Sequence, residues 1–305
     1  MSNYEIVTIG STLIDLLIQS NELGVKRTTQ GLMLCELLGD KIEVDEFTVT
    51  TGGGASNTAI GFARQGFKVA TMSEMGHDAL AEKIIQDLRD EQVETRFITQ
   101  EKREMTGISV ILIAPDGQRT VMVHRGGSSL LEKKDVNWEV VAEAKWVHVS
   151  NVSGQLPLLK KLFTTVAGKN DPGLSWNPGK QDIKLLTSYQ LTIEPQMVDI
   201  LFVNEQEWKL LGSIQSTLKS RISNIVITSG NQGGRVLSVA GELKYEVEKQ
   251  KAVDETGAGD SFAVGFVSEY LRGGELEDCL NLAKKNAASV VGQVGAKSGL
   301  LKVLN

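Results

Sequence analysis

Two glycines and an aspartate stand where the sequence predicts the start of an apolar helix. The run Gly257-Ala258-Gly259-Asp260 precedes an apolar segment with helical spacing that begins at Phe262. The first backbone N–H groups of a helix have no partner within it, and they lie at the positive end of the helix dipole. Small side chains at such a place let an anion approach the backbone closely. The sequence therefore predicts a phosphate-type anion site formed by the amides of Gly257, Ala258 and Gly259.

Asp260 is the unusual member of this run, because a carboxylate beside a phosphate would repel it. The pairing becomes favourable if a hydroxyl group lies between them. The carboxylate then accepts the hydroxyl proton while the backbone amides stabilise charge on the transferred group. These residue types in this order indicate phosphoryl transfer to an alcohol. The alternative is that Asp260 only caps the helix, since Asp is favoured at helix N-termini in any protein.

The longer run Asp254-Glu255-Thr256-Gly257-Ala258-Gly259-Asp260 resembles the second signature of the ribokinase-like (PfkB) family of carbohydrate and nucleoside kinases. An earlier run, Gly52-Gly53-Gly54-Ala55-Ser56-Asn57, is similar to the family's first signature, in which a glycine pair is followed by an asparagine. The resemblance extends from Asp15 to Ala296, with the matching segments in the family's order. It implies a kinase in which Asp260 is the catalytic base.

The resemblance also implies which residues contact the ligands. Substrate binding is expected of Asp15, Gly53, Gly54, Asn57, Asn151 and Asp260. Nucleotide binding is expected of Asn177, Asn204, Thr228, Gly230, Gly233, Thr256, Gly257, Gly259 and Asn286. Ribokinases proper tend to carry Glu where Asn151 stands, which argues against free ribose as the substrate.

ATP and Mg²⁺ are the cofactors that the resemblance implies. The run from Asn204 to Glu207 is similar to the family's Asn-x-x-Glu, and Mg²⁺ keeps several waters, so Glu207 is expected to bind it through water. Several family members bind a monovalent cation, partly through the residue at the position of Asp254 and partly through a late serine. Gly299 stands at that late position, which argues against a K⁺ site in this chain.

The elements that must position these residues alternate between strand and helix along most of the chain. This order predicts an α/β fold with a doubly wound, mostly parallel sheet covered by helices, and ligand sites at the carboxyl ends of its strands. Residues 17–50 and 106–125 are rich in strand patterns instead, which predicts a small β lid inserted in a single domain of residues 1–305. Without the resemblance, Asp15 is interpreted as a loop residue.

Several local patterns yield more specific expectations. Residues 93–99 are expected to form a strand, and the alternation of residues 41–44 predicts a lid strand. Residues 115–118 contain an Asp-Gly pair between two alternating runs, which indicates a hairpin turn. The return arm carries Arg119 and Arg125, each of which faces either a ligand or solvent.

Composition excludes several classes of protein. The chain has 305 residues, 41% of them hydrophobic, which is enough for a sizeable core, and its formal net charge is −6. A nucleic-acid partner is not expected, because it would require clustered Lys and Arg. No membrane partner is expected either, since no apolar run approaches a membrane span, and no signal peptide is recognised. A cytoplasmic protein with reduced thiols is the expectation.

The sequence thus predicts an ATP-dependent carbohydrate kinase that phosphorylates a hydroxymethyl group of a small sugar or sugar derivative. One alternative is a nucleoside kinase of the same family, with a base pocket to which Met33, Leu34 and Phe47 contribute. Another is a non-catalytic ligand-binding protein on the same fold. A nicotinamide dehydrogenase is a weaker alternative, because no Gly-x-Gly-x-x-Gly follows the first strand. Exposed lid strands also make a homodimer through the lid an open expectation.

Overall fold

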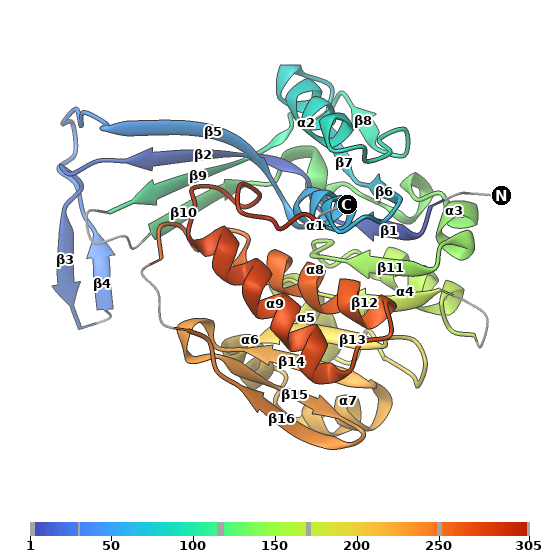
Figure 1. Cartoon of the computed structure of the whole chain (residues 1–305). Helices are drawn as coiled ribbons and strands as arrows, with labels where there is room; N and C mark the ends of the chain where they lie inside the picture. Colours follow the sequence, from blue (N-terminus) through green and yellow to red (C-terminus); the bar gives the residue numbers. More distant parts are fainter. Residues whose placement is uncertain (1–3, 30, 115–118, 169–171, 249–251, 304–305) are drawn as a thin grey trace.

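The computed structural model describes residues 4–29, 31–114, 119–168, 172–248 and 252–303 (Figure 1). Within these residues, eight strands form one large sheet. Their spatial order is β16 (Gly241–Tyr245), β15 (Gly234–Ser238), β14 (Asn224–Thr228), β13 (Ile200–Asn204), β12 (Gly173–Trp176), β11 (Trp146–Val149), β1 (Ile6–Ile9) and β6 (Val69–Met72). Pairing is parallel from β14 to β6, and β15 and β16 are antiparallel. The predicted mostly parallel sheet is confirmed.

Helices cover both faces of this sheet (Figure 1). One hydrophobic core joins the sheet to α1 (Gly54–Arg64), α2 (Ala79–Asp90), α8 (Ala258–Leu271) and α9 (Leu276–Val291). The other core joins it to α3 (Trp138–Glu143), α4 (Leu156–Thr165), α5 (Lys180–Thr187), α6 (Glu205–Leu210) and α7 (Gln215–Arg221). Neighbouring strand residues alternate between the cores: Trp146 belongs to the first, Val147 to the second. Because both faces are buried, these strands are apolar throughout.

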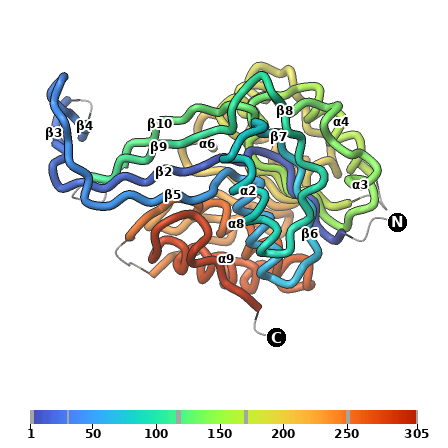
Figure 2. Tube along the Cα trace, turned by 90° about the horizontal axis from the view of Figure 1, so that it is seen from above, coloured from blue at the N-terminus to red at the C-terminus, as the bar shows by residue number. Residues whose placement is uncertain are grey.

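A second sheet extends away from the large one. Its order is β10 (Arg119–His124), β9 (Gly107–Ile113), β2 (Leu13–Gln19) and β5 (Glu46–Gly52), and we call these four the lid strands. A hairpin of β3 (Val25–Thr28) and β4 (Gly31–Leu34) lies at their far end, as Figure 2 shows from above. β9 and β10 lie within residues 106–125, whereas β2 begins at Leu13, before residue 17, and β5 ends at Gly52, beyond residue 50.

The remaining regular elements are short. They are β7 (Glu74–Gly76), β8 (Thr99–Glu101) and the 3₁₀ turns η1 (Gly126–Ser129), η2 (Lys133–Asp135), η3 (Gly212–Ile214) and η4 (Gly230–Gln232). Among the helices of the described residues, none is long and apolar enough to cross a membrane.

Three local expectations were wrong. Residues 93–99 do not form a continuous strand: Glu94 makes a single β-bridge with Ala70 of β6, the Ile98 amide then donates to the Thr95 carbonyl in a turn, and only Thr99 belongs to a strand, β8. Residues 41–44 lie outside the strands, because no neighbouring strand pairs with them. Asp15 is not in a loop but in β2, paired with Thr50 of β5. The predicted hairpin turn at 115–118 lies outside the described residues, although β9 and β10 pair as its two arms.

Candidate active site

The turn into α8 is held by the carboxylate of Asp254. Its Oδ1 accepts hydrogen bonds from the Thr256 amide (2.9 Å) and the Thr256 hydroxyl (2.6 Å), and its Oδ2 accepts one from the Gly295 amide (2.9 Å). Gly257 follows as the N-cap, with φ of 77°. A Cβ there would also lie 2.5 Å from the Cβ of Ala296. Backbone conformation and packing therefore both require glycine at position 257.

The body of α8 is fixed by close helix contacts. A Cβ on Gly265 would lie 2.6 Å from the Cα of Ala283 in α9, and one on Gly61 of α1 would lie 2.7 Å from the side chain of Val264. The three helices approach each other so closely because these positions lack side chains. This packing sets the place of the α8 N-terminus relative to α1, which carries Asn57.

The amides of the first α8 turn differ in one respect from the predicted anion site. The Ala258 amide donates to the carbonyl of Glu255 at 3.2 Å, so it already has a partner. The amides of Gly259 and Asp260 belong to the first helical turn, where N–H groups have no partner within the helix. A Cβ on Gly259 would meet nothing within 4 Å. The geometry therefore presents an open surface at Gly259 that an anion can approach.

Asp260 and Asn57 are 203 residues apart in the sequence and meet in the structure. The Asn57 Nδ2 donates to the Asp260 Oδ2 at 2.8 Å. The Asn57 Oδ1 is buried and has no hydrogen-bond partner in the described structure. Burial raises the pKa of Asp260, and the hydrogen bond from Asn57 partly offsets this. A raised pKa makes Asp260 a stronger base than an exposed aspartate.

The two glycines at the start of α1, Gly53 as its N-cap and Gly54 as its first residue, lie against residues that follow strands β1 and β11. A Cβ on Gly54 would lie 2.5 Å from the side chain of Ser150 and 3.7 Å from the Oδ1 of Asp260. Gly53 has φ of 94°, and a Cβ at this position would lie 2.5 Å from the carbonyl oxygen of Ser11. Gly54 thus adjoins Asp260 directly, whereas Gly53 serves the turn that leads into α1.

Asp15 lies at the base of the lid strands, 4% exposed. Its Oδ2 would be only 1.9 Å from a Cβ on Gly52, so the carboxylate covers that glycine. Burial raises the pKa of Asp15 to about 6, opposed by a hydrogen bond with Ser109 and the charge of Lys297, and reinforced by the negative charges of Asp254 and Asp260. The charges that act on Asp15 show that it shares an electrostatic environment with both motif aspartates.

Four predicted polar residues follow consecutive parallel strands of the large sheet. They are Asn151 after β11, Asn177 after β12, Asn204 at the end of β13 and Thr228 at the end of β14. The carboxyl ends of these strands lie along one edge, where ligands of open α/β sheets bind. Two side chains have partners: the Asn151 Oδ1 accepts from the Ser153 amide (2.8 Å), and the Asn204 Oδ1 accepts from the Glu207 amide (2.8 Å).

The turn after β14 contains the two other predicted nucleotide-site glycines. A Cβ on Gly230 would meet nothing within 4 Å, whereas one on Gly233 would lie 2.1 Å from the carbonyl oxygen of Tyr245. Both have positive φ, 55° and 81° respectively. Gly230 is therefore open toward a ligand, and Gly233 is needed for the close pairing with β16.

Glu207 is the carboxylate predicted to serve Mg²⁺. Its Oε2 accepts from the Asn204 amide at 2.9 Å. Burial raises the pKa of Glu207, and this is opposed by the hydrogen bonds with Asn204 and by the charge of Lys180. A partly buried carboxylate with a raised pKa gains from a nearby cation. Within the described residues no group of three or more His, Cys, Asp or Glu could hold a metal, so Mg²⁺ would depend on the phosphates for most of its ligands.

Asn286 is one of the residues predicted to bind the nucleotide. It is fully buried in α9, its Nδ2 donates to the Ser261 carbonyl (2.7 Å), and its Oδ1 accepts from the Leu301 amide (2.9 Å). Both ends of the side chain thus join α9 to α8 and to the C-terminal segment. Both polar atoms of the Asn286 side chain therefore have a partner within the protein, and its role at the nucleotide stays a prediction.

Three residues near the site were not predicted from the sequence. Ser150 contacts the Gly54 position and Ser109 bonds Asp15. Lys297 is 8% exposed, contacts the Thr51 hydroxyl, and has a pKa lowered to about 8 by burial, against the opposing charges of Asp87 and Asp15. The pairing of β2 with β9 could have pointed to Ser109, but no sequence signal distinguishes Lys297 from a surface lysine.

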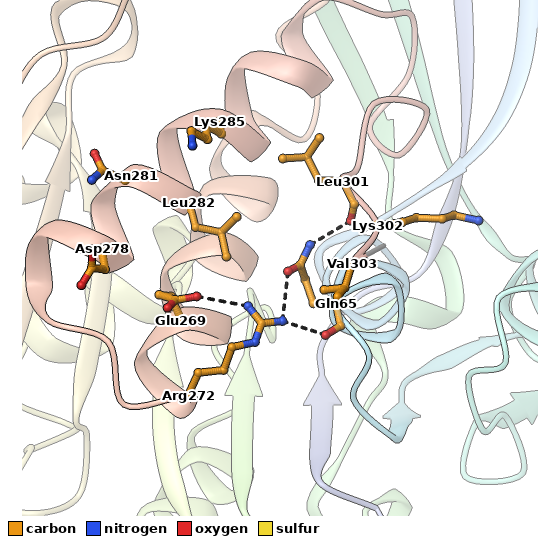
Figure 3. A pocket seen from close by; sticks show the side chains of 10 residues that line it. All are labelled: Gln65, Glu269, Arg272, Asp278, Asn281, Leu282, Lys285, Leu301, Lys302 and Val303. Atoms are coloured by element: carbon orange, nitrogen blue, oxygen red, sulfur yellow. Dashed lines mark hydrogen bonds and ion pairs between the residues drawn. The ribbon is translucent and has the colours of Figure 1, made fainter. Parts of the chain in front are cut away.

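A pocket of about 480 Å³ lies elsewhere, where the end of α8 meets α9 and the C-terminal segment (Figure 3). Arg272 in this pocket donates to the backbone and side-chain oxygens of Gln65 and pairs with Glu269 at 3.2 Å. None of the predicted site residues lines it. Because Arg272 and Glu269 are already paired with each other, this pocket does not offer the combination of free amides and a basic carboxylate found at the start of α8.

Known proteins share this architecture. Residues 3–302 match the family described as pfkB family carbohydrate kinase. The ribokinase of Staphylococcus aureus (strain COL) is 26% identical, over 97% of this chain and 96% of its own. The nucleoside kinase of Methanothermobacter thermautotrophicus is 23% identical, over 97% and 92%. The crystal structure of the Methanocaldococcus jannaschii nucleoside kinase, an archaeal member of the ribokinase family, has a TM-score of 0.79 with 22% identity, over 97% and 95%.

Fold and site geometry together define a ribokinase-type α/β protein. The family match covers nearly the whole chain, and the chain therefore belongs to the pfkB family of carbohydrate kinases. It is accordingly a kinase whose phosphoryl donor is ATP, as the sequence predicted, and the dehydrogenase alternative is wrong.

Proposed function

We propose that this protein transfers the γ-phosphoryl group of ATP to a hydroxymethyl group of a small sugar or sugar derivative. The observation that carries the proposal is the buried, unpartnered Oδ1 of Asn57, whose own Nδ2 holds Asp260. A buried acceptor without a partner costs free energy, about 1–3 kcal/mol. A substrate hydroxyl that donates to Asn57 would recover that cost and would lie directly beside Asp260.

Asp260 acts as the base in this proposal. It accepts the proton of the substrate hydroxymethyl group as the phosphoryl group is transferred. In a loose transition state the proton leaves late, so a carboxylate is a sufficient base. The amides at the start of α8, Gly259 above all, and the positive end of the helix dipole stabilise charge on the transferred group.

ATP is expected along the carboxyl edge of the large sheet, near Asn177, Asn204, Thr228 and Gly230. Its terminal phosphates would lie at the turn of Thr256 to Gly259. Mg²⁺ would neutralise phosphate charge, with Glu207 holding one of its waters. The proposed substrate site comprises Asp15, Gly54, Asn57 and Asp260. Asn151, which follows Ser150 in the sequence, is proposed as a further substrate contact.

A nucleoside is the alternative acceptor, because relatives at similar identity carry the name ribokinase or nucleoside kinase. Residues proposed for a base pocket, Met33 and Phe47, are 44% and 55% exposed in the lid region. Both side chains are therefore accessible to a ligand, and the acceptor panel described next distinguishes the two assignments.

The test is Mg²⁺- and ATP-dependent ADP release with a panel of pentoses, hexoses, sugar acids and nucleosides. We expect release with one class of free sugar or sugar acid. Release with nucleosides alone would shift the assignment to a nucleoside kinase. Absence of release, together with ligand-induced thermal stabilisation, would support the ligand-binding alternative instead.

We expect acceptor binding to depend on pH through Asp15. An aspartate that accepts hydrogen bonds from two substrate hydroxyls must be ionised, and burial raises the pKa of Asp15 to about 6. Affinity should therefore be constant above pH 7 and fall about tenfold between pH 7 and pH 5. The measurement is calorimetric binding of the acceptor to the Asp260→Asn protein, so that Asp260 does not titrate. Asp15→Asn should bind weakly at every pH; if the double variant keeps the pH dependence, another group is responsible.

The same pKa shift affects folding with a defined sign. Because burial raises the pKa of Asp15 above its unfolded value, protonation favours the folded state. The stability this contributes is fully present below the unfolded pKa, near 3.8, and is lost as pH rises through about 6.

We further propose one domain of residues 1–305 whose lid strands close over the substrate, excluding water that would compete as an acceptor. We also propose a cytoplasmic location, because thiols stay reduced there and both Cys35 and Cys279 are free cysteines.

A homodimer through the lid strands is supported by their exposed apolar side chains. Val121, Met122 and Val123 of β10 and Phe47 and Val49 of β5 are each more than 40% exposed. Both strands are edges of the lid sheet, and unpaired edges favour association. Sedimentation equilibrium should give a dimer for the native protein and a monomer for Met122→Lys. A monomeric native protein at micromolar concentration would contradict this proposal.

A further inference from the structure

Arg119 is the residue through which the lid strands reach the loop before α8. It is the first residue of β10, and its Nη1 lies 3.7 Å from the Oδ1 of Asp254 and 3.6 Å from the Oε2 of Glu255. These two carboxylates directly precede Thr256 and the turn at Gly257. A positive charge carried by the lid thus lies between two negative charges of the loop that forms the anion site.

Asp254 requires such a charge. Its side chain is only 1% exposed, and its three hydrogen-bond donors, the two groups of Thr256 and the Gly295 amide, are neutral. Of the basic side chains that the structure describes, Arg119 alone comes within ion-pair distance of this carboxylate. A buried carboxylate without a charge partner is costly, so the loop conformation depends on Arg119.

A monovalent cation, which several members of the family are expected to bind at this place, does not fit the described residues. Both oxygens of Asp254 already accept hydrogen bonds, and the guanidinium of Arg119 already supplies a positive charge beside them. Gly299 has no side chain to offer, and a Cβ there would lie 2.1 Å from the Ser289 carbonyl oxygen. The neighbouring Ser298 hydroxyl donates to the Val294 carbonyl at 2.8 Å.

We infer that Arg119 is a positioning residue that supplies the positive charge at Asp254, so that the anion-site turn forms without a bound monovalent cation. The lid and the turn are then coupled, because the same side chain belongs to β10 and holds the loop. The inference rests on the proposed kinase function for its turnover readout, and on the loop geometry for a second readout that needs no turnover.

The first test compares ADP release by the native protein in buffers whose monovalent cation is K⁺, Na⁺ or tetramethylammonium. Tetramethylammonium is too large to enter a site made for a small cation. We expect turnover to change less than about twofold among the three at equal ionic strength, because screening depends on ionic strength and not on which monovalent cation is present. Turnover that requires K⁺ would overturn the inference.

The second test removes the guanidinium. We expect Arg119→Ala to lower kcat about 10- to 100-fold, since misplacement of a reacting group by about an ångström has effects of that size. The KM for the acceptor should change much less. Arg119→Lys should restore part of kcat, and K⁺ or a non-denaturing concentration of guanidinium should raise kcat of Arg119→Ala but not of the native protein. Arg103→Ala, which removes an exposed arginine paired with Glu101, is the matched control.

A third readout separates this inference from the kinase proposal. Amide hydrogen exchange at Thr256, whose N–H is bonded to Asp254, should accelerate in Arg119→Ala and stay unchanged in Arg103→Ala. This measurement needs no substrate, so it holds even if the native protein shows no turnover with the panel, a result that would contradict only the kinase proposal. Native kcat or native Thr256 exchange in a folded Arg119→Ala protein would refute the role of Arg119.

Discussion

Replacement of Asp260 by asparagine is expected to lower kcat about 10³-fold, within the range of 10² to 10⁴ that a general base contributes. Asparagine has nearly the same shape but cannot accept the hydroxyl proton. Because the Asn57 amide can still donate to the side-chain oxygen at position 260, the site should keep its shape. Acceptor and ATP affinities should therefore stay within a few-fold of the native values. Single-turnover ADP formation and calorimetric binding are the measurements.

Asp278→Asn is a matched control for this prediction. Asp278 is the third residue of α9, as Asp260 is the third residue of α8, so both carboxylates lie in the first turn of a helix, Asp278 exposed and Asp260 half-buried. If Asp260 only capped its helix, both variants should lower the unfolding midpoint and leave kcat unchanged. A loss of kcat in Asp260→Asn alone would support catalysis, and near-native kcat would refute the assignment.

The sheet could be predicted because its strands are buried on both faces. Runs such as Ile6–Ile9 and Ile200–Asn204 are apolar at nearly every position, and the second is followed directly by helix α6. The site at the start of α8 could be predicted for a similar reason, since glycine and aspartate before an apolar helix have few structural explanations. These features depend on local sequence patterns, which can be recognised without knowledge of the structure.

Other features depend on contacts between distant segments. Residues 93–99 contain apolar residues suited to a strand, but only Glu94 bridges to β6 before the chain turns at Thr95, whose hydroxyl accepts a hydrogen bond from the Arg89 side chain. The partnership of Asn57 with Asp260 and the burial of Lys297 beside Thr51 arise only when α1, α8 and the C-terminal segment are packed together. The pairing of the Ala258 amide with the Glu255 carbonyl follows from the turn geometry, which the residue types do not specify.

The second large effect is expected at Gly259. A Cβ at this position would meet no protein atom within 4 Å, so Gly259→Ala should fold normally. Alanine also favours helix over glycine by about 0.5–1 kcal/mol, so the unfolding midpoint should stay or rise. The added methyl group would occupy the space where the transferred phosphoryl group approaches the helix. We expect kcat/KM for ATP to fall about 10²-fold or more, the scale seen when one oxyanion donor is lost.

Gly257→Ala provides the contrast that makes this test decisive. At position 257 a Cβ would collide with Ala296 and strain a backbone with φ of 77°, so this variant should lose both stability and kcat. A loss of kcat with native stability at position 259, beside a loss of both at position 257, would place the phosphate against the open surface at Gly259. Native kcat/KM in Gly259→Ala would instead show that the phosphates bind elsewhere on the carboxyl edge, because no ligand could then contact the first turn of α8 closely.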